Sequence, residues 1–457
     1  MSKLLFNEFD AVTSKQWKQK IQFDLKGADY NDSLIWKTNE DIDIKPFYHI
    51  DEFKDSFKLS NTKATQWKIC QSIFVADVKK SNKKALNAIE RGAESIKFLI
   101  PNETVTIQDL IENIDTSSTS LYFEFQFLSE KYINLFSGIL NKENIYIQTD
   151  IIGNLAKSGN WFSTLQNDHV EFESIVNKTN TISIDMALYQ NAGANMVQQL
   201  AYGLSQANEY LNHFDAILSK EKKESTRIIF NVAVGTNYFF EIAKLKALRI
   251  LWETLASEYG FNTDCHIVAI PTKRNKTLYD YNTNLLRTTT ECMSAILGGA
   301  NTICNLPYDT IYHKDNEFGE RIARNQLLVL KHESYFDKVN NPSDGAYYIE
   351  TLTKQLAEKS LDIFKNIEAN SGFLKQLKEG TIQRKIKESA EKEQQQFNEG
   401  KHILLGSNKY PNPNDKMKHE LELYPFVKTN QRKTLIEPII EKRLAEKLEQ
   451  ERLKKED

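Results

Sequence analysis

What the sequence lacks narrows the classes of protein that it can encode. Its 457 residues carry a net charge of −3, so no strong electrostatic field favours nucleic acid or an acidic membrane surface as a partner. No apolar run approaches the roughly 20 residues that a bilayer-spanning helix needs. The opening residues, MSKLLFNEFD, contain neither a long apolar core nor a small-residue cleavage site, which argues against a signal peptide. We therefore expect a cytoplasmic protein with no nucleic-acid or membrane partner.

Cysteine is scarce, and its placement argues against both disulfides and metal. The four cysteines are Cys70, Cys265, Cys292 and Cys304, and none of them forms a C-x-x-C pair. A zinc site needs clustered Cys and His ligands, which this spacing does not provide. We expect four reduced, buried thiols.

A regular rhythm of short apolar runs and longer amphipathic segments begins near residue 65. It predicts eight strands, over 69–75, 95–100, 120–127, 145–150, 182–186, 227–234, 265–270 and 301–306. The clearest helices are 192–218, 238–259, 284–298 and 318–333. Eight strands, each followed by a helix, predict an α/β fold of the (β/α)8 TIM-barrel class. A doubly wound open sheet is the alternative, but no G-x-G-x-x-G follows the first strand.

The segments on either side of the barrel are of a different kind. Residues 1–64 have too little periodic apolar surface to fold alone, and we interpret them as an extended N-terminal arm. The barrel occupies 65–395, and 396–457 form a helical, linker-like C-terminal extension. The last helix, expected over 439–457, is so rich in charge that a solvated helix or a frayed tail is the default interpretation.

The carboxyl ends of the barrel strands are where an active site is expected. The polar residues assigned to these ends include His266, Thr272, Lys273, Arg274 and Asp309. They form no recognisable carboxylate pair, Ser-His-Asp set or metal trio. A barrel enzyme with new chemistry based on Lys273, Arg274 and Asp309 is a remote alternative.

Three shorter stretches carry weaker signals. His266 lies in DCHIVA, which lacks the final Gly of the cobalamin-ligating D-x-H-x-x-G, so a core or rim histidine is the simpler interpretation. LGGAN (297–301) is more simply a helix C-cap than a phosphate loop. The strand-to-helix junction SIDMALYQNAGA (183–194) carries Met186, Ala187 and Leu188, which have no side chain that can hold or move a proton.

Several longer stretches, taken together, resemble the methylmalonyl-CoA mutase family of adenosylcobalamin-dependent carbon-skeleton isomerases. They run in the family's order from about residue 17 to 450, nearly the whole chain. The matching words are DLKGADY, IKPFY, NAGANMVQQLAYGLSQANEYL, VGTNYFFEIAKLKALRILW, NTNLLRTTTECMSAILGGANTICN, RIARNQLLVLKHESYFDKVNNPSDGAYYIETLT and LLGSNKYPNP. The resemblance implies a (β/α)8 barrel, in agreement with the strand count.

The resemblance also implies that the family's catalytic side chains are replaced here. Cys70 and Ser72 stand where active members have an arginine and a tyrosine, and Ser158 stands where they have a second arginine. Ala187 and Leu188 replace a tyrosine and a histidine. Leucine cannot donate a hydrogen bond to a thioester carbonyl, and serine cannot grip a carboxylate as a charged pair. The family's cobalamin-binding domain would follow Asp457, so we expect no cofactor, metal or catalytic residue in this chain itself.

The resemblance thus favours the non-catalytic small (beta) subunit of a heterodimeric methylmalonyl-CoA mutase. A large (alpha) subunit would hold adenosylcobalamin and interconvert methylmalonyl-CoA and succinyl-CoA. The arm would wrap this partner through Trp17, Ile21, Leu25, Ile35 and Trp36, although these residues could instead cover the chain's own barrel. The alternative function is an active barrel chain of an acyl-CoA mutase that uses a separate cobalamin-binding protein. A cob(II)alamin radical signal would distinguish the two.

Overall fold

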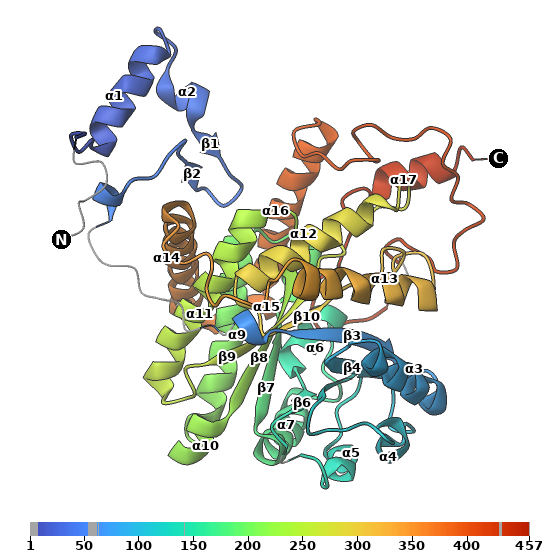
Figure 1. Ribbon diagram of the computed structural model, residues 1–457. Helices are drawn as coiled ribbons and strands as arrows, with labels where there is room; N and C mark the ends of the chain where they lie inside the picture. The colour runs from blue at the N-terminus through green and yellow to red at the C-terminus, as the bar shows by residue number, and fades with distance from the viewer. Residues whose placement is uncertain (1–7, 54–61, 63, 141, 429–431, 457) are drawn as a thin grey trace.

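A parallel eight-stranded sheet, curved into a nearly closed barrel, forms the centre of the molecule (Figure 1). The structure is a computed structural model that describes residues 8–53, 62, 64–140, 142–428 and 432–456. The strands follow the order β6-β5-β4-β3-β10-β9-β8-β7. Their bounds are β3 (Lys68–Phe74), β4 (Ser95–Ile100), β5 (Ser120–Phe125), β6 (Ile145–Gln148), β7 (Thr181–Asp185), β8 (Arg227–Val234), β9 (Cys265–Pro271) and β10 (Thr302–Cys304). All eight predicted strands are confirmed, each end within two residues of its predicted place.

Side-chain hydrogen bonds hold the two edge strands, β6 and β7, beside each other. The Ser183 hydroxyl of β7 donates to the carbonyl of Thr149, just past β6, at 2.9 Å. At the other end, the Arg227 guanidinium donates to the Ile145 carbonyl of β6 at 2.7 Å and to the Thr181 hydroxyl of β7 at 3.3 Å. These contacts close the ring where backbone pairing stops. The predicted TIM-barrel class is therefore confirmed.

Helices follow the strands and cover the outside of the barrel (Figure 1). Their bounds are α3 (Val78–Glu90), α4 (Ile107–Leu110), α5 (Glu130–Ile133), α6 (Ile151–Ser158), α7 (Leu165–Thr179), α8 (Ala187–Ala192), α9 (Met196–Phe214), α10 (Lys220–Ser225), α11 (Tyr238–Tyr259), α12 (Thr283–Leu297) and α13 (Glu317–Leu328). Short 3-10 helices are η1 (Ile50–Glu52), η2 (Ala64–Gln66) and η3 (Asn134–Phe136), and η4 (Val329–Glu333) is a π-helical continuation of α13. Among the described helices, none is long and apolar enough to span a bilayer.

Local sequence signals explain where several of these helices begin and end. Asn195 caps α9 in a capping box with Gln198, and Gly260 ends α11 in the left-handed region at φ 69°. The helix predicted over 192–218 is α9, which begins at Met196 because Gly193, at φ 101°, ends the preceding helix α8. A Cβ at Gly193 would lie 2.5 Å from the Ala390 Cβ, so only glycine allows this close approach.

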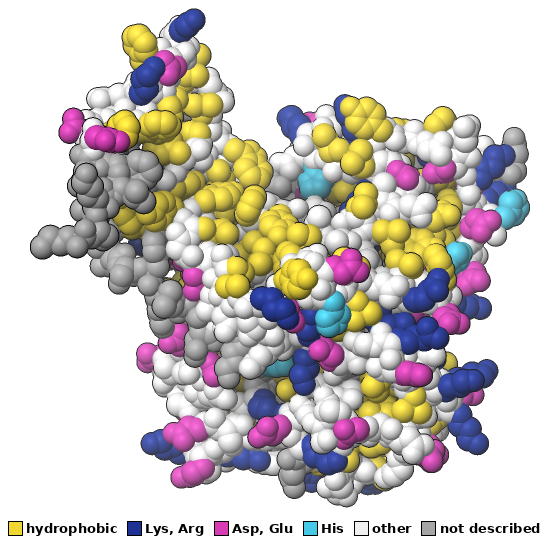
Figure 2. Space-filling model, in the orientation of Figure 1, with side chains coloured by type: hydrophobic (Ala, Val, Ile, Leu, Met, Phe, Trp, Pro, Cys, Tyr) yellow, Lys and Arg dark blue, Asp and Glu magenta, His cyan; other side chains and the backbone are white. Residues whose placement is uncertain are grey.

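The N-terminal arm extends from the barrel and carries much exposed apolar surface (Figures 1 and 2). It consists of α1 (Ser14–Asp24), α2 (Tyr30–Leu34) and a hairpin of β1 (Trp36–Lys37) and β2 (Asp43–Ile44). All of α1 is described, and none of its residues is buried. Its N-terminal end is held within the arm, because the Ser14 amide donates to Asp51 at 2.8 Å.

The C-terminal part of the chain is helical, as predicted, over α14 (Tyr347–Ala369), α15 (Gly372–Lys378), α16 (Thr381–Asn398) and α17 (Glu446–Leu453). Among the described residues of the predicted extension, 396–457, only the end of α16 and α17 are helical. The default of a solvated or frayed tail is wrong. Leu444, Ala445 and Glu449 are at most 1% exposed, and Glu449 accepts the Leu278 amide at 2.8 Å. The last helix begins at Glu446 and not at 439, because backbone amides between these positions bond to the barrel rim. The rim acceptors are the carbonyls of Ala156, Asn191 and Arg274.

Candidate functional site

The junction between β7 and α8 is intact as backbone and carries no acid, base or nucleophile at Ala187 or Leu188. Leu188 is 1% exposed and belongs to the main hydrophobic core, and Ala187 is half-buried. The backbone amide of Ala187 donates to the Asp185 carboxylate at 3.1 Å. At the position where the resemblance implies a hydrogen-bond donor to a carbonyl, this chain has an apolar side chain that packs into the core.

The other predicted positions lie on separate elements. Cys70 of β3 is in register with Cys304 of β10, and both thiols are buried inside the barrel. Burial raises the pKa of the Cys70 thiol well above its ordinary value. Ser72 lines a cavity of about 190 Å³ that also contains Lys273. Ser158 ends α6, where its hydroxyl donates to the Asn160 carbonyl at 2.8 Å and accepts the Asn160 amide at 3.0 Å.

The residues that sequence reasoning proposed for new chemistry do not form one site. The Arg274 side chain pairs with Glu393 at 2.6 Å. The Asp309 carboxylate accepts hydrogen bonds from Asn316 at 2.7 Å and from His313 at 3.1 Å. Arg274 and Asp309 are therefore each engaged with a structural partner of their own.

The sequence analysis did not predict a charged cluster near the carboxyl ends of strands β4, β5 and β7, which we call the mouth of the barrel. Lys97 of β4 lies 2.7 Å from Glu124 of β5, with side chains 5% and 38% exposed. Lys97 lowers the pKa of Glu124, and Glu124 outweighs the opposing effect of burial to raise the pKa of Lys97. Burial raises the pKa of Asp185, at the end of β7, to about 6, although Lys157 opposes this shift. The charge of Lys273 also lowers the pKa of Glu124, so Lys273 lies at the same mouth of the barrel.

A signal for this cluster was present in the sequence. Lys97 interrupts the apolar run SIKFLI, and Glu124 interrupts SLYFEF. A charged residue inside a buried strand normally has a partner, because an isolated buried charge is very costly. Two adjacent strands with opposite charges on the same face, offset by two residues in register, therefore predict an internal ion pair.

His266 lies at the opposite end of the barrel from this mouth, so its assignment to the carboxyl ends is wrong. It is the second residue of β9, and the amino ends of parallel strands share one face. Its Nε2 is 2.8 Å from the Tyr122 hydroxyl, and its ring stacks on Tyr146 with centroids 4.8 Å apart. Burial lowers its pKa to about 3, so it is a neutral, interior residue. The simpler interpretation of His266 as a core or rim residue is confirmed.

LGGAN is a helix end, as expected: Gly298 caps α12, and Gly299 follows at φ 82°. Within the described residues, no group of three His, Cys, Asp or Glu side chains could hold a metal ion. The four cysteines are free and buried, as predicted. The mouth of the barrel therefore offers charge and hydrogen bonds, and its described residues provide no assembled catalytic set.

A second hollow, of about 540 Å³, lies over the carboxyl ends of β8 and β9. The arm forms one of its walls through residues 36–40. A fully buried ion pair forms another: Lys244 contacts Glu241 at 2.6 Å and donates to Gln190, Gln199 and the Ala233 carbonyl. Because both charges are 0% exposed and well supplied with partners, this pair is a structural anchor of the β8–α11 junction.

The sequence of this chain is similar to those of known proteins, and these similarities show the family to which it belongs. A model of the methylmalonyl-CoA mutase family matches residues 140–455. The methylmalonyl-CoA mutase small subunit of Porphyromonas gingivalis is 31% identical over 449 residues, covering 89% of this chain and 71% of that protein. The methylmalonyl-CoA mutase of Cereibacter sphaeroides is 28% identical, covering 86% and 64% respectively.

The chain also matches a large subunit over about half of its own length. The methylmalonyl-CoA mutase large subunit of Porphyromonas gingivalis is 30% identical over 243 residues, covering 52% of this chain and 34% of that protein. The chain thus spans between about a third and about 70% of the length of these relatives. Fold, family model and relatives agree, and the chain belongs to the methylmalonyl-CoA mutase family.

Proposed function

We propose that this chain is the non-catalytic small subunit of an adenosylcobalamin-dependent methylmalonyl-CoA mutase. It would support a large subunit that interconverts methylmalonyl-CoA and succinyl-CoA, an isomerase reaction. The observation that carries the proposal is the β7–α8 junction, where Leu188 is packed into the core in place of a hydrogen-bond donor. Four free, buried cysteines support a cytoplasmic location. The proposed reaction would belong to propionate metabolism.

The reaction needs groups that the predicted positions do not supply. Stabilising charge on a thioester carbonyl requires a donor placed at the oxygen, and a leucine side chain has none. Binding a substrate carboxylate favours a bidentate arginine, whereas the Ser158 hydroxyl is already used by the turn at Asn160. The Cys70 thiol faces Cys304 and stays protonated. Together these replacements support a pseudoenzyme.

The described residues do not fit a resident cobalamin. Cobalt takes nitrogen ligands such as histidine, and His266 is engaged with Tyr122 at the amino end of the barrel. The carboxyl mouth presents the Lys97–Glu124 pair, whose charges satisfy each other. We therefore derive no catalytic step for this chain and assign adenosylcobalamin to the partner subunit.

The arm supports the assignment of a protein partner. Trp17 and Trp36 are 52% and 53% exposed, and Ile21, Leu25 and Ile35 are half-buried. Large aromatic side chains with this exposure are typical of interface anchors. Trp36 also contacts Phe240 of α11, with ring centroids 6.1 Å apart, so it serves the chain's own barrel as well. The other four residues are the stronger interface candidates.

Co-expression with a candidate large subunit tests the proposal. We expect the two chains to elute as one species in size-exclusion chromatography, with mutase activity that is absent from this chain alone. A stable monomer that binds no large subunit would overturn the proposal. Activity of the isolated chain would also overturn it.

The alternative, an active barrel that uses a separate cobalamin-binding protein, has one observation in its favour. Lys97, Lys157 and Lys273 surround the mouth, where a substrate carboxylate would need positive charge. The discriminating experiment adds adenosylcobalamin and methylmalonyl-CoA to this chain with a cobalamin-binding protein. A cob(II)alamin radical signal supports the alternative, and its absence supports the non-catalytic subunit.

A further inference from the structure

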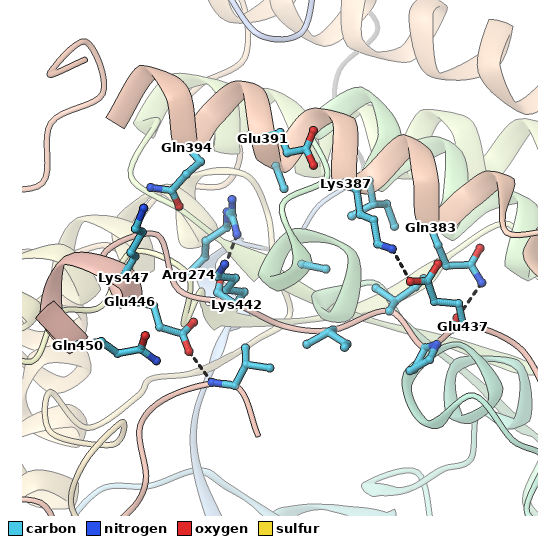
Figure 3. Close-up of a pocket in the computed structure, with 17 residues that line it drawn as sticks. Arg274, Gln383, Lys387, Glu391, Gln394, Glu437, Lys442, Glu446, Lys447 and Gln450 are labelled. Carbon is cyan, nitrogen blue, oxygen red and sulfur yellow. Dashed lines mark hydrogen bonds and ion pairs between the residues drawn. The ribbon is translucent and has the colours of Figure 1, made fainter. Parts of the chain in front are cut away.

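A cavity of about 580 Å³ lies between α16 and the C-terminal segment, outside the barrel mouth (Figure 3). One face of α16 forms its upper wall, from Gln383 to Gln394. These positions are about 16 Å apart at about 1.5 Å of rise per residue. Residues 437–442 and the start of α17 form the other walls. Its volume lies in the range of small-molecule sites, which is roughly 300–1,000 Å³.

The lining of the cavity has an apolar, preformed part. Ile386, Ile439 and Ala192 are between 3% and 7% exposed, so their positions are fixed by the surrounding protein. Ala390 and Pro438 complete this apolar lining, and Ile440 is 54% exposed at its rim. Apolar surface that is concave and open to water gains free energy when a ligand's apolar body covers it.

Some of the charged side chains that line the cavity have ion-pair partners, and others do not. Lys442 and Lys447 lie at the same end as Arg274 (Figure 3). Arg274 is already paired with Glu393, but within the described residues neither lysine has an ion pair. Of the three carboxylates that line the cavity, Glu437 pairs with Lys387 and Glu446 accepts the Val427 amide. Glu391 is exposed on α16.

We propose that this cavity binds a medium-chain aliphatic carboxylate. The chain would lie over Ile386, Ala390 and Ile439, and the carboxylate would lie between Lys442 and Lys447. An apolar lining that follows the length of the α16 wall selects an unbranched aliphatic body, and two unpaired ammonium groups select an anionic end. The length of the α16 wall favours a chain longer than that of butyrate. This site is separate from the barrel mouth and does not depend on the proposed function.

Isothermal titration calorimetry on the full chain tests the proposal with decanoate, octanoate and butyrate as probes. We expect decanoate and octanoate to bind saturably at one site per chain, and butyrate to bind at least tenfold more weakly. Decyltrimethylammonium, which has a chain of the same length and the opposite charge, should also bind at least tenfold more weakly. Equal affinity for the ammonium probe, several sites per chain or no saturable binding would overturn the proposal.

Two pairs of variants localise the site. The double variant Lys442→Glu/Lys447→Glu should lose at least tenfold in decanoate affinity. Its control, Lys378→Glu/Lys392→Glu, changes the net charge equally at exposed positions of α15 and α16 that do not line the cavity, and it should bind normally. Ile440→Asp should likewise lose binding, whereas Ile403→Asp, at a 53% exposed position elsewhere, should not. Normal binding by both cavity variants, or equal loss in the controls, would overturn the proposal.

Discussion

Asn39 of the arm and Gln396 of α16 exchange two side-chain hydrogen bonds, one in each direction, at 2.9 and 2.8 Å. The Asn195 side chain, at the start of α9, adds a third bond to the Asn39 carbonyl at 3.0 Å. The hairpin of the arm is thereby fixed to two barrel-covering helices. The exposed part of the arm extends from this anchor.

Breaking this anchor should loosen the arm without unfolding the barrel. We expect Asn39→Ala to increase hydrogen exchange across residues 30–53 severalfold, because each lost bond contributes about 1 kcal/mol. The matched control is Gln395→Ala, which removes an exposed bond to Glu399 on the same helix. Exchange in the arm that is equal in the two variants would show that the Asn39–Gln396 pair does not hold it.

Removing one partner of the buried Lys244–Glu241 pair should be costly. Lys244→Ala leaves the Glu241 carboxylate without its cation at 0% exposure, and we expect the free energy of unfolding to fall by about 3–5 kcal/mol. The comparison is Lys354→Ala, which breaks an exposed pair with Glu358 and should cost less than about 1 kcal/mol. Urea denaturation of the two variants measures the difference. Similar losses would contradict the structural role of the buried pair.

Asp185 should make stability depend on pH. The fold raises its pKa from 3.8 to about 6, so between these values the folded state binds more protons than the unfolded state. This contribution to stability is therefore present at low pH and is lost as the pH rises to about 6. Asp185→Asn should gain stability relative to the native chain between pH 4 and pH 7, by no more than about 3 kcal/mol. Urea denaturation at both pH values checks this, and a difference that does not change with pH contradicts it.

Restoring the family's side chains at the junction should not create an enzyme. Ala187→Tyr/Leu188→His would place an imidazole in the core position of Leu188, and we expect a loss of about 2–4 kcal/mol in stability. Cys70 and Ser158 would still lack the positive charge of the arginines that the resemblance places at these positions. The measurement is the radical signal with adenosylcobalamin and methylmalonyl-CoA. A signal from this double variant would show that the rest of the site is functional.

The C-terminal helix should contribute to the stability of the barrel. Glu449 accepts the Leu278 amide and pairs with Arg443 at 2.6 Å, at 1% exposure. Glu449→Ala leaves the Leu278 amide without its acceptor and Arg443 without its carboxylate, and we expect a loss of about 3 kcal/mol in the free energy of unfolding. Glu451→Ala changes an exposed residue of the same helix and should have little effect. Thermal melts compare the two, and equal melting temperatures would contradict the prediction.

The strands and helix α11 could be predicted because their apolar patterns are strong and local. Ile242, Leu245, Leu248 and Trp252 recur at helical spacing, and all four are at most 1% exposed. The tail could not be predicted in this way, since Glu446 and Glu449 are buried by contacts with Val427 and Leu278, far away in sequence. The Lys97–Glu124 pair could be found only by comparing the charged residues of neighbouring strands, because the two residues lie on different strands, β4 and β5. The division at residues 64 and 395 and the assigned site residues remain predictions.

The anchoring of the arm has a thermodynamic consequence for association. Aromatic contacts with α14 also fix the arm. The ring centroids of Tyr48 and Tyr348 are 5.5 Å apart, and those of Phe53 and Tyr347 are 5.3 Å apart. A segment ordered before it meets its partner has already lost its conformational entropy during folding. Association through α1 would therefore pay less for ordering this segment than a disordered tail would, which favours slow dissociation.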